Sequence, residues 1–267
     1  MQRFLGAAIA AAAVAGFASA AAAAPVAAYN WTGFYIGANA GYAWSDVDLT
    51  SRFTCPTGAC PYTNQTQLDA IGAAGSGSFS PNVFTGGGQV GYNFQNGPFV
   101  YGVELDIQSF HLSRRIDGGR LVPASGGQTA EVSASVDTNW LFTARPRIGW
   151  LVQPQLLLYV TGGLALTKID VANSVSDNCA AVQTCGLPDL AGASSASKTK
   201  AGWTLGGGTE WAFSPQWSVK AEYLYVSFGD VSTTSTTNLS LSPNPNIMKT
   251  SASINASIAR IGVNFRF

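Results

Sequence analysis

The sequence predicts an all-β chain folded as an eight-stranded antiparallel up-and-down transmembrane β-barrel, with short turns at one end and four long loops at the other. Three observations predict this fold. Segments of about ten residues alternate between apolar and polar side chains, the connections between them alternate between short and long, and aromatic residues gather near the segment ends.

The alternation is clearest in the last segment, 257–267, because successive strand residues point to opposite faces. Arg260, Asn264 and Arg266 share one face, and neither a charge nor an amide is tolerated in hydrocarbon. The other face is apolar and consists of Ala259, Ile261, Val263, Phe265 and Phe267. The apolar face is therefore expected to point outward to lipid and the polar face into the lumen.

Seven earlier segments show the same pattern. They are 33–45, 83–94, 99–110, 138–151, 156–168, 200–213 and 217–228. The short turns between them are 95–98, 152–155 and 214–216, and the long connections are 46–82, 111–137, 169–199 and 229–252. The long connections are rich in Ser, Thr, Gly, Asn and Pro, so stretches such as 194–197 and 232–238 are expected to be mobile surface loops.

Aromatic residues on the apolar face form two bands. Phe34, Trp150 and Phe265 lie near the short turns, whereas Trp44 and Tyr225 lie toward the long connections. Two aromatic girdles around an aliphatic band are typical of barrels in an outer membrane. In a soluble ligand-binding barrel, the remaining contender for this pattern, the large apolar residues would fill the interior instead.

The composition excludes some classes of function. The 267 residues include 14 basic and 14 acidic side chains, so there is no net field to attract nucleic acid. The N-terminus carries Arg3, an Ala-rich apolar run over 4–17 and the small residues 18–20, which together predict a secretory signal peptide over 1–22 with cleavage at about 20–24. The barrel domain is expected to span 29–267.

The four cysteines lie in two long connections. Cys55 and Cys60 are in the first, and Cys179 and Cys185 are in the third. Neither spacing is that of a zinc site, so no metal and no cofactor are expected. Export to an oxidising compartment favours one disulfide within each connection, although four cysteines allow 3 pairings.

Charged residues on the polar faces are expected to meet in the lumen. They are Glu104, Asp106, Arg145, Arg147, Glu210, Lys220, Glu222 and Arg260. Glu104 and Asp106 should lie level with Arg147 and Arg145 on the next strand, and Glu210 level with Lys220, close enough for cross-strand ion pairs. About eight strands leave an interior just wide enough for side chains, which favours a plug over a selective pore lined by the same residues.

Several motifs resemble opacity-type small outer-membrane barrels, a group that includes the outer-membrane immunogenic proteins of alpha-proteobacteria and is often labelled porin family. The matching stretches are 31–37 (WTGFYIG), 86–93 (GGGQVGYN), 101–106 (YGVELD), 147–149 (RIG), 203–210 (WTLGGGTE), 222–225 (EYLY) and the final Phe267. One departure is Ser227 before Phe228-Gly229, where the family pattern has an acidic residue. The resemblance covers every strand and none of the long connections.

The resemblance implies an exported barrel in the bacterial outer membrane, with periplasmic turns and external loops. It also implies a C-terminal assembly signal at Val263, Phe265 and Phe267, read by the barrel-assembly machinery. Outer-membrane lipid and lipopolysaccharide are the expected surroundings. Some members of the group are adhesive or bind haemin, so a host surface or haemin is an expected partner of the loops.

The only histidine, His111, precedes Leu112-Ser113 in a pattern similar to the H-x-S pair of outer-membrane lipid A deacylases. The pair lies at the loop end of its strand, and no carboxylate is placed to orient the imidazole, so catalysis is not expected. Arg114 and Arg115 are expected to meet lipopolysaccharide phosphates. His111 and Tyr62 are the haem-ligand types near the loops.

The sequence therefore predicts a non-enzymatic integral outer-membrane barrel with a structural and surface-interaction role. A small-solute channel is the main alternative, and a haemin-binding or lipid A-modifying barrel is a minor one.

Overall fold

The computed structural model describes residues 29–54, 65–121, 129–178, 191–237 and 246–267. The predicted signal peptide and all four cysteines lie outside these residues. The elements in order are β1 (Gly33–Thr54), α1 (Gln65–Ala74), β2 (Gly77–Phe79), β3 (Asn82–Asn96), β4 (Phe99–Leu121), β5 (Ala130–Gln153), β6 (Leu156–Asp177), β7 (Ala191–Ala212), β8 (Trp217–Thr237) and β9 (Asn246–Arg266).

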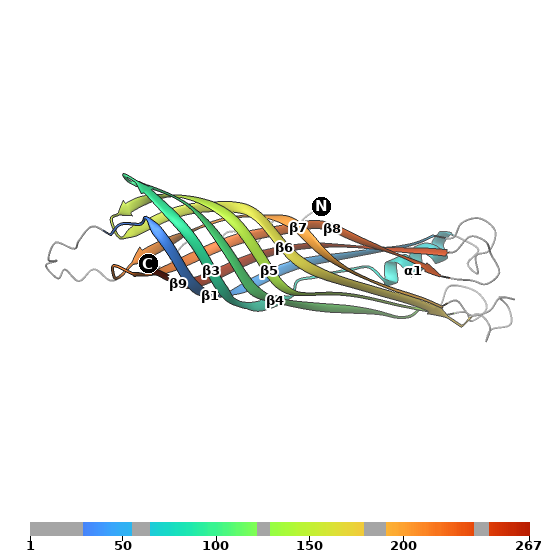
Figure 1. Cartoon of the computed structure of the whole chain (residues 1–267). Coiled ribbons are helices and arrows are strands. Elements are labelled where there is room, and N and C mark those ends of the chain that lie inside the picture. Colours follow the sequence, from blue (N-terminus) through green and yellow to red (C-terminus); the bar gives the residue numbers. More distant parts are fainter. Residues whose placement is uncertain (1–28, 55–64, 122–128, 179–190, 238–245) are drawn as a thin grey trace, which may run out of the picture.

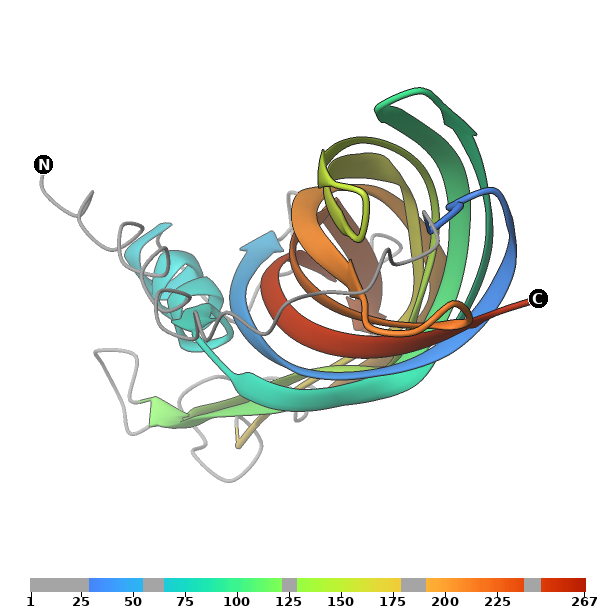
Figure 2. The ribbon, with the colours of Figure 1, turned by 90° about the vertical axis from the view of Figure 1, so that its left-hand side faces the viewer.

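The nine strands form one antiparallel sheet in the order β2-β1-β3-β4-β5-β6-β7-β8-β9, and β1 also pairs with β9. Because β2 has three residues and pairs with β1 at the side, the wall consists of β1 and β3 to β9, the eight strands expected. The β1–β9 ladder runs from Tyr35↔Arg266 to Thr54↔Ile247 and closes the ring. Figure 2 shows the strands winding around a common axis.

The strands are longer than predicted. Most of the four stretches expected as loops belong to strands, including the Ser/Thr-rich residues 194–197 of β7 and 232–237 of β8. Expecting these residues to be mobile surface loops was wrong. A ten-residue helix, α1, also lies within the first expected loop. The error arose because the apolar and polar faces of the strands exchange places beyond the outward apolar band, on the side away from the tight turns.

In the half of the barrel next to the tight turns, the outward side chains are apolar and the inward ones polar. Phe34, Leu105 and Leu205 are among the exposed apolar residues of this half, whereas Glu104 and Arg145 are buried inside. We call this part, which carries the outward apolar band up to Trp44, Ile107, Phe142, Leu166, Trp203, Tyr225 and Ala259, the closed half. Its polarity is the expected one.

Beyond that band the polarity reverses, in the part that we call the open half. Outward residues of β1 become Asp46, Asp48, Thr50 and Arg52, all of them exposed. Inward residues become apolar and pack into two adjoining clusters. The larger cluster includes Val47, Leu49, Phe110, Val136, Ile169, Val171, Val231 and Ile254, and the one beyond it includes Phe53, Ile71, Val132, Val175 and Met248. The open half therefore has the apolar core of a water-soluble domain.

The wall of the open half is split by two seams. The β3–β4 ladder ends at Gly87↔Gln108, and the β7–β8 ladder ends at Trp203↔Ser227. Between the seams, β4, β5, β6 and β7 form one sheet and β8, β9, β1 and β2 form the other. Figure 1 shows the strands separating into these two groups at the end that carries α1. The open half is a two-layered sandwich continuous with the barrel.

The first seam is covered by the segment that contains α1 and β2. Ile71 of α1 is buried in the apolar core, and Ser51 of β1 donates a hydrogen bond to the Gly75 carbonyl at 2.8 Å. On the other side of the seam, Gly118 of β4 lies so close to the Ala74 carbonyl that a side chain there would collide with it. In the described part of the chain, no helix is long and apolar enough to cross a membrane.

Because the polarity reverses, a charge added to the outward face should destabilise the closed half much more than the open half. Leu105→Arg places a charge on the outward face of the closed half, where 45% of the leucine surface is exposed, and should cost about 2–4 kcal/mol of unfolding free energy in lipid bilayers. Thr50→Arg, on the outward face of the open half, should change stability by about 0.5 kcal/mol or less. Denaturant unfolding in liposomes, followed by the gel shift of the folded barrel, measures both. Equal losses would contradict the boundary drawn between the halves.

Candidate functional site

The lumen of the closed half holds the charged residues singled out in the sequence. Inward positions of five strands supply them, because every second residue of a strand faces the axis. They are Glu104 and Asp106 of β4, Arg145 and Arg147 of β5, Glu210 of β7, Lys220 and Glu222 of β8, and Arg260 of β9, each of them buried. The structure brings all eight together into one network of ion pairs.

Glu104 is the centre of this network. One of its carboxylate oxygens lies 2.7 Å from Lys220 Nζ and 2.7 Å from Arg145 Nη2. The other accepts a hydrogen bond from the Tyr35 hydroxyl at 2.8 Å. Arg260 and Arg147 follow at 3.6 and 3.8 Å. The carboxylate is thus surrounded by cations from β5, β8 and β9, and it joins opposite walls of the barrel.

A second group of pairs lies beside it. Arg260 lies 2.6 Å from Glu222 and 3.0 Å from Asp106. Arg145 lies 2.8 Å from Asp106 and 3.2 Å from Glu222. Each carboxylate therefore bridges the same two arginines. A buried charge is stable only when it is paired and hydrogen-bonded in this way.

The expected height of two carboxylates was wrong, and one expected pairing is made differently. Glu104 lies opposite Arg145 and not Arg147, and Asp106 lies opposite Thr143, so that Arg145 pairs with both carboxylates. Glu210 and Lys220 are opposite one another in the β7–β8 ladder, as expected, yet Lys220 extends across the lumen to Glu104. Glu210 pairs instead with Arg147 at 3.0 Å and accepts hydrogen bonds from Ser218 and Asn264. The barrel is so narrow that side chains on facing walls come as close to one another as side chains on neighbouring strands. Strand register, which is what the sequence predicts, does not show which side chains meet across the lumen.

The uncharged members of the network were missed from the sequence. Tyr35 bonds Glu104, and Tyr159 donates to Glu222 at 3.0 Å. Gln89 donates to Asn264 at 2.7 Å, and Arg147 donates to Asn93 at 2.9 Å. Each of these residues occupies an inward-facing position in the alternation of its strand. That alternation is the sequence signal that could have identified them.

Glycine is the complementary signal. Gly91 faces the lumen on β3 opposite Tyr35, and a methyl group there would overlap the tyrosine ring. Because Gly91 has no side chain, the Tyr35 ring can lie against it and its hydroxyl can reach Glu104. A small residue on one strand thus makes room for a large polar residue on the next.

Residues that precede β1 pack at the tight-turn end of the barrel. Trp31 is 1% exposed, donates from its indole nitrogen to the Pro154 carbonyl at 3.1 Å, and packs edge-on against Tyr29. The Arg266 guanidinium lies over the Tyr29 ring at 4.2 Å. Burial raises the pKa of the Tyr29 phenol, which keeps it neutral. These aromatic side chains cap the ionic network from below.

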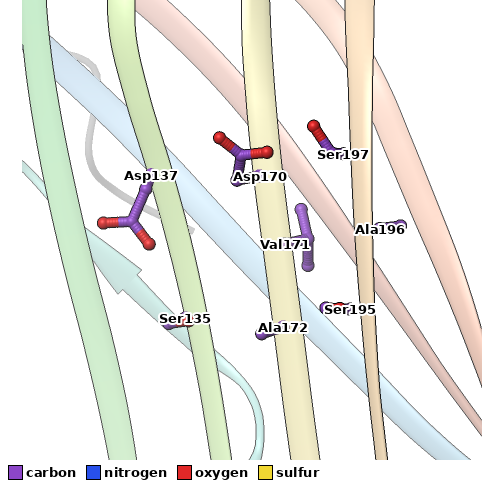
Figure 3. Close-up of a pocket in the computed structure, with 8 residues that line it drawn as sticks. All are labelled: Ser135, Asp137, Asp170, Val171, Ala172, Ser195, Ala196 and Ser197. Atoms are coloured by element: carbon purple, nitrogen blue, oxygen red, sulfur yellow. The ribbon is translucent and has the colours of Figure 1, made fainter.

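Two cavities open at the surface of the described residues. One, of about 140 Å³, lies on the outward face of the open half among Ser135, Asp137, Asp170, Ser195 and Ser197 (Figure 3). This volume is well under the ~300–1,000 Å³ of typical small-molecule sites. The other, of about 330 Å³, lies at the tight turns beside Tyr29 and Gln95. Among the described residues, no three His, Cys, Asp or Glu side chains are grouped to hold a metal ion.

The remaining predicted site residues lie on the surface or outside the described residues. His111 is exposed in the irregular stretch of β4 between Ser109 and Leu112. Asp137 lies opposite Ser113, and no hydrogen bond joins His111 to a carboxylate in the described part of the chain. Arg114 is also exposed. Tyr62 and the cysteines, Cys55, Cys60, Cys179 and Cys185, fall outside the described residues, so haemin ligation and the disulfides stay predictions.

The C-terminal residues of the expected assembly signal lie on the outward face or at the end of β9. Val263 and Phe267 are exposed, and Phe265 packs edge-on against Trp217 and Phe267. The Phe267 amide donates to the Phe34 carbonyl at 3.1 Å. This contact extends the join between the first and last strands to the end of the chain.

An apolar outward belt around a polar, charged interior is the pattern of a small membrane β-barrel. Residues 9–267 match the model of the family described as "Outer membrane protein beta-barrel domain". The chain belongs to that family and is an outer-membrane protein.

Two curated relatives are immunogenic proteins of Brucella. The chain is 35% identical over 251 residues to the "31 kDa outer-membrane immunogenic protein" of Brucella melitensis, which covers 93% of this chain and 89% of that protein. It is 24% identical to the "25 kDa outer-membrane immunogenic protein" of Brucella abortus, over 76% of this chain and 68% of that protein. Among solved structures, OprG from Pseudomonas aeruginosa is similar with a TM-score of 0.40 and 13% identity, over 88% of this chain and 96% of that chain.

The cross-lumen pair predicts strong energetic coupling. Lys220→Met leaves the buried Glu104 carboxylate with one cation fewer, and should cost about 3–5 kcal/mol of unfolding free energy. Glu104→Gln leaves Lys220 without its carboxylate and should cost a similar amount. The double variant should lose clearly less than the sum of the two single variants, because it buries no unpaired charge.

Arg115→Ala is the matched control, since it breaks the solvent-exposed pair with Asp117 and should have little effect. Denaturant unfolding in detergent or liposomes measures all four variants. Strictly additive losses for Lys220→Met and Glu104→Gln would show that the two residues do not interact across the lumen.

Proposed function

We propose that this protein is a closed outer-membrane barrel with a structural and surface-interaction role, which anchors a β-sandwich outside the cell. The observation that supports a closed barrel most directly is the packing of the lumen. Arg145, Lys220 and Arg260, three of its longest side chains, are at most 3% exposed and bonded to carboxylates from other strands. A path through the closed half would have to break these pairs.

The charge balance of the lumen supports the same proposal. Four carboxylates, Glu104, Asp106, Glu210 and Glu222, face four cations, Arg145, Arg147, Lys220 and Arg260. Pores attract and select ions with rings of side chains that carry charge of one sign. The eight residues of this network carry no net charge of either sign. Above the network lies the apolar core of the open half, and below it lies Trp31, so two further layers oppose passage.

A surface role is supported by the outward faces of the open half. β1, β5, β6 and β9 all continue past the apolar belt with Ser, Thr, Asp, Asn and Lys outward. Strands of this length with a core of their own are not needed to cross lipid, which takes about 9–11 residues per strand. β5, for example, has 24 residues. The extra length presents a rigid, polar surface to the surroundings.

Lipopolysaccharide is the proposed neighbour of the boundary between the halves. Lys168 of β6 is exposed immediately beyond Leu166, the last outward apolar residue of its strand. Arg114 and Arg115 are exposed on β4, seven and eight residues beyond Ile107, the last outward apolar residue of that strand in the closed half. Guanidinium and ammonium groups at this height fit the phosphates of the lipid headgroup layer.

A closed lumen predicts the absence of a steady pore. Protein purified from outer membranes and added to planar bilayers should give no stable, uniform conductance steps, and proteoliposomes should not swell in small sugars. A 16-stranded porin prepared in the same way is the positive control. Stable steps that disappear with Lys220→Met or shift with Glu104→Gln would instead establish the small-solute channel.

The proposed exposure predicts which residues are labelled on intact cells. In a chain whose native cysteines are replaced by serine, Asp48→Cys in the open half should react with a membrane-impermeant maleimide. Gly97→Cys, in the tight turn between β3 and β4, should react only after the outer membrane is permeabilised. Leu105→Cys, in the lipid belt, should react in neither case. Labelling of Gly97→Cys on intact cells would reverse the orientation and reject the proposal.

A further inference from the structure

The second seam of the open half leaves two strand edges without partners. β7 and β8 pair from Ala212↔Ser218 to Trp203↔Ser227 and then part. Beyond this point β7 runs on over 191–202 and keeps its ladder with β6, while β8 runs on over 228–237 and keeps its ladder with β9. Within the described ranges, neither stretch has a strand partner on the side that faces the seam. Each edge is therefore a row of main-chain donors and acceptors available for pairing.

The chain covers the two seams differently. It covers the β3–β4 seam with its own α1 and β2. At the base of the β7–β8 seam, Gly202 lies against Ser227 and Phe228, and beyond it Lys200 Nζ donates a hydrogen bond to the Asp230 carbonyl at 2.8 Å. A long lysine side chain bridges the two edges where a ladder would bring the backbones together directly. Near the base of the seam, the two edges are therefore joined through this side chain and not through a backbone ladder. Figure 1 shows the two groups of strands apart from there to the end of the barrel.

We propose that this seam is a pairing surface for a second copy of the chain in the same membrane. Both copies must stand the same way up, so a twofold axis between them runs along the membrane normal. Around that axis the β7 edge of one copy meets the β8 edge of the other. β7 and β8 are antiparallel, so both new ladders have the ordinary antiparallel direction.

The charges on the edges favour this arrangement over the pairing of like edges. The 191–202 edge carries Lys198 and Lys200, and the 228–237 edge carries Asp230. A β7 edge facing a second β7 edge would oppose like charges and would also have to be parallel. A β7 edge facing a β8 edge avoids this repulsion. No bulky side chain occurs over 191–202, which consists of Ala, Gly, Ser, Thr and Lys, so close approach is unobstructed.

The existing ladder fixes the expected register. Trp203 pairs with Ser227, and the irregularity between Ser227 and Asp230 adds one residue to β8. Continued from there, Ser197 of one copy comes opposite Thr234 of the other. Both residues are exposed on the outward face, which is the condition for neighbours in one ladder. The pairing would make each sheet of one open half continuous with the opposite sheet of its neighbour.

Disulfide cross-linking in native membranes tests the proposal. Two chains without native cysteines are co-expressed, one with Ser197→Cys and one tag, the other with Thr234→Cys and a second tag. Oxidation with copper phenanthroline should give a band of twice the monomer mass that carries both tags. Either variant expressed alone should stay monomeric, because like edges do not meet. Ser135→Cys with Ser253→Cys, in the middle of the two sheets, is the matched negative pair.

Two results would overturn the proposal. The first is the lack of a mixed dimer although both variants fold, as shown by the gel shift of the unheated barrel. The second is efficient cross-linking within one chain that carries both Ser197→Cys and Thr234→Cys, which would mean that the seam closes on itself. The proposal rests on the open half projecting from the cell. Maleimide labelling of each single variant on intact cells tests that separately, so failed exposure and failed pairing are distinguished.

Discussion

The closed half depends on the pairing of charges across its lumen, and Glu104 is where that pairing converges. Its carboxylate is in contact with Lys220, Arg145 and the Tyr35 hydroxyl, groups that come from three other strands. Taking an ion out of water costs several kcal/mol, and attraction repays this only when geometry and hydrogen bonding are satisfied. Since Glu104 joins β4 to β5, β8 and β9, the network ties together strands on facing sides of the barrel as well as neighbours in one ladder.

The second constraint is the change of solvent along the strands. Next to lipid, the outward face must be apolar and the interior can be polar, because the interior is where backbone and side-chain groups find partners. Beyond the headgroups, water takes the place of lipid and the hydrophobic effect reverses the arrangement. Ile254 and Arg260 both point inward from β9, only six residues apart, yet one lies in an apolar core and the other in an ionic network.

The seams follow from that change. A ring of eight strands encloses just enough space for side chains, and a polar network fills it. An apolar core is filled more compactly by two sheets packed face to face, so the ring flattens and its ladders part where it leaves the belt. α1 and β2 cover one of the resulting gaps from within the chain. The unpaired β7 and β8 edges result from this change from barrel to sandwich. They are the edges at which the proposed pairing between two copies would occur.

The sequence by itself determined the closed half: its eight strands, the tight turns, the face that meets lipid and the eight charged residues of the lumen. These follow from alternation, which is a local property of each strand. It did not reveal that the strands continue, because residues such as Asp46, Asp48 and Ser195 on the outward face resemble loop composition. The inward residues there, such as Val47 and Leu49, are apolar, whereas the inward residues of the same strands in the closed half are polar.

What only the tertiary structure decided is which distant groups meet. Register correctly placed Lys220 opposite Glu210, but the lysine crosses to Glu104, since the width of the lumen and the space left by glycines such as Gly91 are set by all the strands together. The split of the wall is likewise a property of two sheets and one core. Alternation along a single strand reports which side chains share a face, and it carries no information on how far apart two faces lie.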